Sequence, residues 1–189
     1  MIVVFVRHGE SEGNVAGIIN DDPRRHVGLT ALGQRQAAEA ALALRHRAFT
    51  HAFASEFPRA QQTAQHILRH HECTLEIDAR LNERRSGMDG MPVDAFNGPA
   101  RRDPLRYKSP RGESFLEEVE RLREFLAGVQ AFAADAHVLA VAHEDPILAA
   151  QVVAGVKPAT AAVASIRNCG RITLKFSAGV WRVAAADAN

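Results

Sequence analysis

The chain has 189 residues, of which 47% are hydrophobic and 24% are charged, and its formal net charge is +1. This length and composition are typical of a compact globular protein, so we expect a single domain over residues 1–189. The near-zero net charge excludes a broad electrostatic surface for nucleic acid, and two cysteines are too few for a disulfide framework. Such sparse cysteine usage favours a reducing compartment, which we expect to be the cytoplasm.

A buried strand is predicted at residues 2–6, where β-branched and aromatic side chains follow one another without a polar break. The apolar run MIVVFV stops at Arg7 and has no basic segment before it, so we expect neither a signal peptide nor a membrane span. A helix is predicted over residues 30–44, with Thr30 as its N-cap and apolar side chains at helical spacing.

A second strand is predicted at residues 51–54, and Pro58 then suits the first turn of another helix because that turn needs no N–H donor. The inner face of this helix recurs at helical spacing and consists of Ala60, Ala64, Ile67 and Leu68.

Residues 88–111 are rich in Gly, Pro and Arg and have no clear period, which predicts a loop. A loop of this length suggests a functional segment, such as a lid over a substrate. Ser114 and Glu117 then have the spacing of a capping box and predict the start of a long helix. Residues 137–142 are predicted to form another buried strand.

The chain ends in one more helix and a hairpin. Asp145 and Pro146 are typical of an N-cap and a first helical residue, and the runs 171–176 and 180–184 predict a closing β-hairpin. Because strands alternate with helices, we expect an α/β fold with three layers, α/β/α, around a mostly parallel central sheet.

Ligands of such sheets bind beyond the carboxyl ends of the strands. The predicted strands end at Arg7 and His8, at Ser55 with Arg59 one turn further on, and at His143. Two arginines and two histidines would therefore meet at one edge of the sheet. Since a guanidinium group binds a tetrahedral oxyanion with two donors, this edge predicts a pocket for a phosphate or a carboxylate.

Six segments of the sequence, in this order, resemble the signature segments of the histidine phosphatase superfamily, which has the phosphoglycerate-mutase-like fold. They are VRHGESEGN at 6–14, LTxxGxxQA at 29–37, SxxxRAxxTA at 55–64, LNER at 81–84, GES at 112–114 and AH at 142–143. One RHG triplet would be a weak signal, but an ordered set of six is specific.

The resemblance implies that His8 is a nucleophile that becomes a phosphohistidine. It implies that Glu83 protonates the leaving oxygen and later takes a proton from the attacking water. The side chains implied to hold the phosphoryl oxygens are Arg7, Arg59 and His143, with Asn14 assisting. No metal and no organic cofactor are implied, since guanidinium groups would neutralise the phosphoryl charge.

Two features of the sequence leave alternatives open. Glu10, Glu113 and Glu144 are further candidates for the acid, because LNE is a short motif. Glu144 also departs from the family pattern, in which Gly usually follows the second histidine. A carboxylate beside a phosphate pocket weakens anion binding unless it meets a cation. Glu144 could select a substrate with a positive or hydrogen-donating group, or it could slow turnover of ordinary phosphate esters.

The short segment between the acid motif and GES resembles the small phosphatases of the family. We therefore expect metal-independent hydrolysis of a small phosphorylated metabolite, with phosphoglycerate mutase activity as the alternative. A phospho-ligand-binding pseudoenzyme is the alternative of another class. Arg84, Arg102 and Arg111 are expected to meet an additional negative group on the substrate. No motif indicates an oligomeric state.

Overall fold

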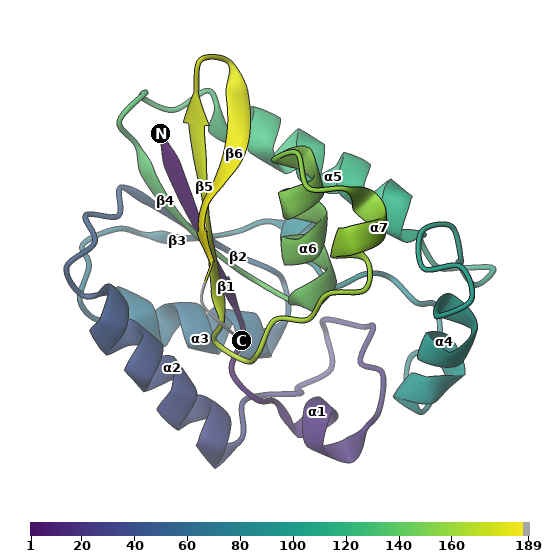
Figure 1. Ribbon diagram of the computed structural model, residues 1–189. Coiled ribbons are helices and arrows are strands. Elements are labelled where there is room, and N and C mark those ends of the chain that lie inside the picture. The colour runs from purple at the N-terminus through teal and green to yellow at the C-terminus, as the bar shows by residue number, and fades with distance from the viewer. Residues whose placement is uncertain (187–189) are drawn as a thin grey trace.

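The computed structural model describes residues 1–186 and has a six-stranded central sheet in the order β3-β2-β4-β1-β5-β6 (Figure 1). The strands are β1 (Ile2–Arg7), β2 (His51–Ala54), β3 (Leu75–Ile77), β4 (His137–Ala142), β5 (Arg171–Ser177) and β6 (Val180–Ala186). β1, β2, β3 and β4 pair in parallel, whereas β5 is antiparallel to β1 and forms a hairpin with β6. The prediction of a mostly parallel sheet closed by a hairpin is confirmed.

The helices lie on both faces of this sheet (Figure 1). They are α1 (Glu12–Ala16), α2 (Ala31–Leu44), α3 (Pro58–Leu68), α4 (Val93–Ala100), α5 (Phe115–Val129), α6 (Glu144–Val153) and α7 (Pro158–Ala161), with a 3-10 turn at Ala79–Leu81. The predicted caps are present: Thr30 accepts a hydrogen bond from the Gly33 N–H at the start of α2, and Ser114 forms a capping box with Glu117 at the start of α5. In the described part of the chain, no helix is both long and apolar enough to cross a membrane.

The pleat of β1 divides the core into two layers. Val4 and Val6 belong to the cluster that α2 and α3 cover, whereas Val3 and Phe5 belong to the cluster under α5 and α6. Because successive side chains of a strand point to opposite faces, a continuous apolar strand needs cover on both sides. The expected three-layer α/β/α arrangement is confirmed.

Two predictions about local structure are wrong. Residues 88–111 do not form a continuous loop, because α4 lies within them. This helix is short, contains Pro99 and buries one side chain, Phe96, so its sequence carries no helical period. In addition, Asp145 is not an N-cap: α6 already begins at Glu144, with His143 in the capping position. Pro146 permits this earlier start because the N–H groups of the first helical turn need no intrahelical acceptor.

The chain leaves β1 in close contact with the start of α2. A Cβ atom added to Gly9 would lie 2.5 Å from the Gly33 carbonyl oxygen, and one added to Gly33 would collide with the Glu10 carbonyl oxygen. Two glycines therefore allow the backbone after His8 to touch the first turn of α2.

The other side of this backbone is held by the segment that precedes β5. The Cys169 N–H donates to the Arg7 carbonyl oxygen at 3.0 Å, and the Asn168 amide nitrogen donates to the His8 carbonyl oxygen at 3.1 Å. The backbone around His8 is thus held on one side by the start of α2 and on the other side by the segment that precedes β5.

Candidate active site

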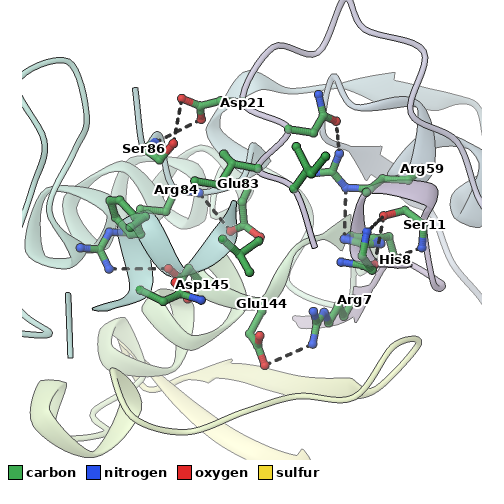
Figure 2. A pocket seen from close by; sticks show the side chains of 18 residues that line it. Arg7, His8, Ser11, Asp21, Arg59, Glu83, Arg84, Ser86, Glu144 and Asp145 are labelled. Carbon is green, nitrogen blue, oxygen red and sulfur yellow. Dashed lines mark hydrogen bonds and ion pairs between the residues drawn. The ribbon is translucent and has the colours of Figure 1, made fainter. Parts of the chain in front are cut away.

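A cavity of about 230 Å³ lies at the carboxyl ends of the parallel strands. Its walls come from the end of β1, from α1 and the loop after it, from α3, from residues 83–86, from α4 and from the start of α6. Figure 2 shows Arg7, His8 and Arg59 on one side of this cavity and Arg84 and Asp145 on the other. The strand ends thus meet at one edge, as the sequence predicts.

The ring of His8 is oriented by its own neighbour. His8 is 2% exposed, and its Nδ1 lies 2.7 Å from the Gly9 carbonyl oxygen. A carbonyl oxygen only accepts, so the proton is on Nδ1 and the lone pair is on Nε2. Nε2 accepts a hydrogen bond from Arg59 Nε at 3.2 Å. Burial, and next the charge of Arg59, hold the pKa of His8 well below its usual value, so the ring is neutral at physiological pH.

Arg59 is a buried cation at the start of α3. Its Nη1 donates to Asn20 Oδ1 at 2.5 Å, its Nη2 donates to His143 Nδ1 at 3.2 Å, and its guanidinium carbon lies 4.4 Å from the centre of the Phe57 ring. Burial lowers its pKa to about 10, which leaves the side chain charged at neutral pH. Arg59 therefore brings a fixed positive charge to the nitrogen of His8 that carries the lone pair.

His143 lies behind Arg59 and is fully buried. Since Nδ1 accepts from Arg59, the proton is on Nε2, which donates to Ser55 Oγ at 2.8 Å. The rings of His143 and His8 pack edge to face with centroids 4.9 Å apart. Burial, followed by the charge of Arg59, keeps the pKa of His143 well below its usual value. In this arrangement His143 does not line the cavity but holds the arginine that does.

Arg7 and Glu144 form an ion pair at the cavity wall. Arg7 Nη1 lies 3.2 Å from Glu144 Oε1 and also donates to the Ile166 carbonyl oxygen. The same Oε1 accepts the Ile166 N–H at 2.7 Å. The carboxylate that replaces the family's glycine therefore meets a cation, and one nitrogen of Arg7 is already occupied.

Glu83 is half-buried and belongs to the cavity lining. Its Oε1 accepts the Arg84 N–H at 3.0 Å, and its Oε2 lies 3.9 Å from His143 Nδ1. Burial, and next the neighbouring charge of Asp145, raise the pKa of Glu83 to about 7. The hydrogen bond from the Arg84 N–H, and then the charges of Arg59 and Arg7, act in the opposite direction. A carboxyl group with this pKa both donates and accepts a proton near neutral pH.

The other candidate acids have partners of their own. Glu10 accepts from Thr30 Oγ1 at 2.7 Å, and Glu113 pairs with Arg121 at 2.6 Å. Neither lines the cavity, whereas Glu144 does but is bound to Arg7. Of the four candidates, Glu83 is the one that lines the cavity without an ion pair to an arginine, and its Oε2 is not engaged by a backbone N–H.

The expected contact of three arginines with a second negative group needs correction. Arg102 follows α4 and Arg111 lies near Gly87; both are exposed, and neither lines the cavity. Arg84 does line it, but its donors are engaged by the protein. Its Nε donates to the Glu113 carbonyl oxygen, its Nη2 to the Tyr107 carbonyl oxygen, and its Nη1 lies 3.7 Å from Asp145 Oδ2.

Asn14 lines the cavity, as expected of a residue in the first motif. Its Oδ1 accepts from the Ser11 N–H at 3.0 Å, which forms the capping box of α1. Sequence reasoning missed six polar side chains of the lining. Ser11 lies in the first motif but has no predicted role, and the other five stand outside the quoted motifs: Asn20, Asp21, Ser86, Asn97 and Asp145. The motif SxxxRA contains Ser55, but nothing in its spacing indicates the bond to His143.

Together these groups can hold an anion and exchange a proton beside a neutral imidazole, which is the equipment of a phosphoryl-transfer enzyme. Among residues 1–186, no group of three or more His, Cys, Asp or Glu side chains is arranged to hold a metal ion.

The model of the histidine phosphatase superfamily (branch 1) matches residues 3–188. The chain belongs to this superfamily. This match and the phosphatases among the chain's relatives indicate that the protein is an enzyme of the phosphoric monoester hydrolase class.

Two curated relatives illustrate the range of the family. A probable phosphoglycerate mutase GpmB from Proteus mirabilis is 33% identical over 75% of this chain and 68% of its own length. The fructose-2,6-bisphosphatase TIGAR from Bos taurus is 32% identical over 65% of this chain and 48% of its own length. The chain thus spans about half the length of this second relative.

Solved structures show the same fold at lower identity. A mycobacterial glucosyl-3-phosphoglycerate phosphatase in complex with VO3 has a TM-score of 0.86 at 24% identity, with 100% of this chain and 99% of that chain covered. A phosphoserine phosphatase from Entamoeba histolytica in complex with 3-phosphoglyceric acid has a TM-score of 0.83 at 22% identity, with 100% and 97% covered.

Proposed function

We propose that this protein hydrolyses a phosphomonoester of a small metabolite through a phosphohistidine at His8, without a metal ion. One observation carries the proposal. The unprotonated Nε2 of a neutral His8 lies 3.2 Å from the buried cation Arg59, in a cavity whose wall carries Glu83 with a pKa of about 7. A nucleophile, a phosphoryl-binding cation and an acid are therefore present in one cavity.

The reaction takes two displacements. In the first, His8 Nε2 attacks phosphorus, the P–O bond to the leaving group breaks, and the leaving oxygen takes the proton of Glu83. In the second, water attacks phosphorus, Glu83 takes a proton from that water, the P–N bond breaks, and inorganic phosphate leaves. The second step regenerates neutral His8 and protonated Glu83, so atoms and protons balance over the cycle.

Arg7, Arg59 and Asn14 are the proposed donors to the phosphoryl oxygens, because all three line the cavity beside His8. Preorganised donors of this kind stabilise charge in the transition state without reorganisation. His143 would act through Arg59, whose Nη2 it holds. The whole chain would serve as one catalytic domain, and its cysteines, Cys73 and Cys169, are both free, which fits the reducing cytoplasm.

The relatives support a small phosphorylated metabolite as substrate. Their names specify phosphoglycerate, fructose 2,6-bisphosphate and glucosyl-3-phosphoglycerate, and one homologous fold binds 3-phosphoglyceric acid. Mutase activity is the second candidate, since a probable phosphoglycerate mutase is 33% identical to this chain. A mutase must keep its acidic product bound so that the phosphoryl group can be transferred back to it. Arg84 could bind the carboxylate of such a product, but two of its donors are already taken by backbone carbonyl groups. Hydrolysis is therefore preferred.

The decisive experiment traps the phosphoenzyme. Wild-type protein is mixed with a radiolabelled phosphomonoester and quenched in base, and the label is followed on the denatured chain. A base-stable, acid-labile adduct in the wild type that is absent from His8→Ala is expected. Its absence from the wild type under all conditions would favour the phospho-ligand-binding pseudoenzyme. Monophosphoglycerate, with and without a bisphosphoglycerate primer, distinguishes a mutase from a hydrolase.

A further inference from the structure

The residue after His143 is the point at which this chain departs from its family, and the structure places its carboxylate in a closed set of contacts. One oxygen, Glu144 Oε1, accepts both the Ile166 N–H at 2.7 Å and Arg7 Nη1 at 3.2 Å. Arg7 Nη1 in turn donates to the Ile166 carbonyl oxygen. The side chain of Arg7 from β1, the carboxylate of Glu144 from α6 and the backbone of Ile166 in the segment 162–170 thus bind one another. Figure 2 shows the ion pair between Glu144 and Arg7.

The segment 162–170 also reaches the backbone of the proposed nucleophile. Asn168 donates its amide hydrogen to the His8 carbonyl oxygen, and the Cys169 N–H donates to the Arg7 carbonyl oxygen. The anchor at Ile166 is two residues before Asn168. Glu144 therefore holds both the side chain of Arg7 and the segment that fixes the backbone of Arg7 and His8.

The contacts leave part of Arg7 available. Its side chain is 17% exposed and lies in the cavity lining, and within residues 1–186 its Nε is buried without a hydrogen-bond partner. A buried donor without a partner is costly, so Nε adds nothing to the stability of this contact set. Because Arg7 lines the cavity, the exposed part of its guanidinium group can donate to a bound phosphoryl oxygen. The negative charge of Glu144, meanwhile, opposes the binding of any anion at this point.

We propose that Glu144 is a positioning residue with two separable effects on the proposed phosphatase reaction. Its contacts fix Arg7 and the segment 162–170 in the geometry that phosphoryl transfer requires. Its charge weakens the binding of inorganic phosphate, so that the product leaves readily. The inference rests on the proposed function. In it, the carboxylate of Glu144 binds Arg7 and does not bind a cationic group of the substrate.

Two variants separate the contacts from the charge. Glu144→Gln keeps an oxygen at the position of Oε1, where it can accept from both Ile166 and Arg7, but removes the charge. Glu144→Ala removes the contacts and the charge together. Asp94→Asn is the matched control, because Asp94 is an exposed carboxylate of α4 that does not line the cavity. Each protein is tested for the dissociation constant of inorganic phosphate and for the single-turnover rate of phosphoenzyme formation.

For Glu144→Gln we expect phosphate to bind roughly tenfold more tightly, the size expected when a unit charge a few ångströms from an anion is removed. Its single-turnover rate should stay within about threefold of the wild type. For Glu144→Ala we expect a rate about 10- to 100-fold lower, because a misplaced donor loses its catalytic value, and phosphate binding no tighter than in the wild type. Asp94→Asn should match the wild type in both measurements.

The proposal is overturned if Glu144→Ala forms the phosphoenzyme at the wild-type rate, or if Glu144→Gln binds phosphate no more tightly than the wild type. It is also overturned if the variants change KM for an amine-bearing ester while a neutral ester is unaffected, since Glu144 would then select the substrate. If wild-type protein forms no phosphoenzyme, the proposed function fails. Phosphate binding to the two variants then still decides whether Glu144 positions Arg7, because that measurement needs no turnover.

Discussion

The pKa of Glu83 predicts how the rate depends on pH. If Glu83 is the acid of the first displacement, kcat/KM requires its protonated form, because this ratio reports the free enzyme. With a pKa of about 7, half of the protein is protonated at pH 7. At an ordinary glutamate pKa of 4.5, the fraction at pH 7 would be about one in 300, so the shift raises the active form roughly 150-fold. We therefore expect kcat/KM to fall with a midpoint near pH 7 and then about tenfold per pH unit.

The assay measures kcat/KM between pH 5 and pH 9 for an alkyl phosphate, corrected for ionisation of the substrate at a pKa of about 6. His8 adds no further midpoint above its usual pKa, because burial holds the pKa of its ring well below that value. Glu83→Gln should reduce kcat/KM for the alkyl ester by about 10²- to 10⁴-fold, remove the alkaline decline, and spare an activated aryl phosphate.

Asp145→Asn provides a second test of the same assignment. Asp145 raises the pKa of Glu83 by repulsion between the two carboxylates, so its neutral analogue should move the alkaline midpoint to lower pH. A wild-type decline that already runs from pH 5 without a plateau, a decline that persists in Glu83→Gln, or a shift to higher pH in Asp145→Asn would each refute the assignment of Glu83 as the acid.

Two further predictions concern stability. Gly33→Ala should lower the free energy of unfolding by about 1–3 kcal/mol in urea, because its Cβ would collide with the Glu10 carbonyl oxygen; Gly98→Ala, which meets no atom within 4 Å, should not. Glu118 is fully buried, and burial raises its pKa well above the usual value despite Arg121, so its protonated form stabilises the fold at low pH and this contribution is lost as pH rises. The stability of Glu118→Gln should therefore decline less between pH 5 and pH 8 than that of the wild type, and equal declines would contradict the reasoning.

Elements with a local chemical signal were predictable from the sequence. β1, β2 and β4 are apolar runs covered on both faces, and α2, α3 and α5 begin with a capping threonine, a proline or a capping box. Three of the missed elements lack such signals. α4 buries one side chain and contains a proline, β3 is a three-residue edge strand without a buried residue, and the capping box of α1 uses Asn14 where glutamate or glutamine is usual.

The residues of the candidate site also include some that the sequence predicts and some that it does not. Arg7, His8, Arg59 and His143 follow strand ends, and the carboxyl ends of parallel strands share one edge of the sheet. The sequence does not reveal which arginine of a loop faces the cavity, because that depends on packing between distant segments. Arg84 illustrates this, since its donors are taken by carbonyl groups 23 and 29 residues away.

The order of the strands also has a consequence for synthesis of the protein. Within residues 1–186, β1 pairs with β4 and β5, which begin at His137 and Arg171. At ribosomal speeds, on the order of ten seconds separate the emergence of β1 from that of its first partner. During this interval the nascent chain carries the apolar segment IVVFV with both edges unpaired, which is an aggregation hazard. Of the six described strands, the one that presents His8 thus leaves the ribosome first, and it is among the last to be secured.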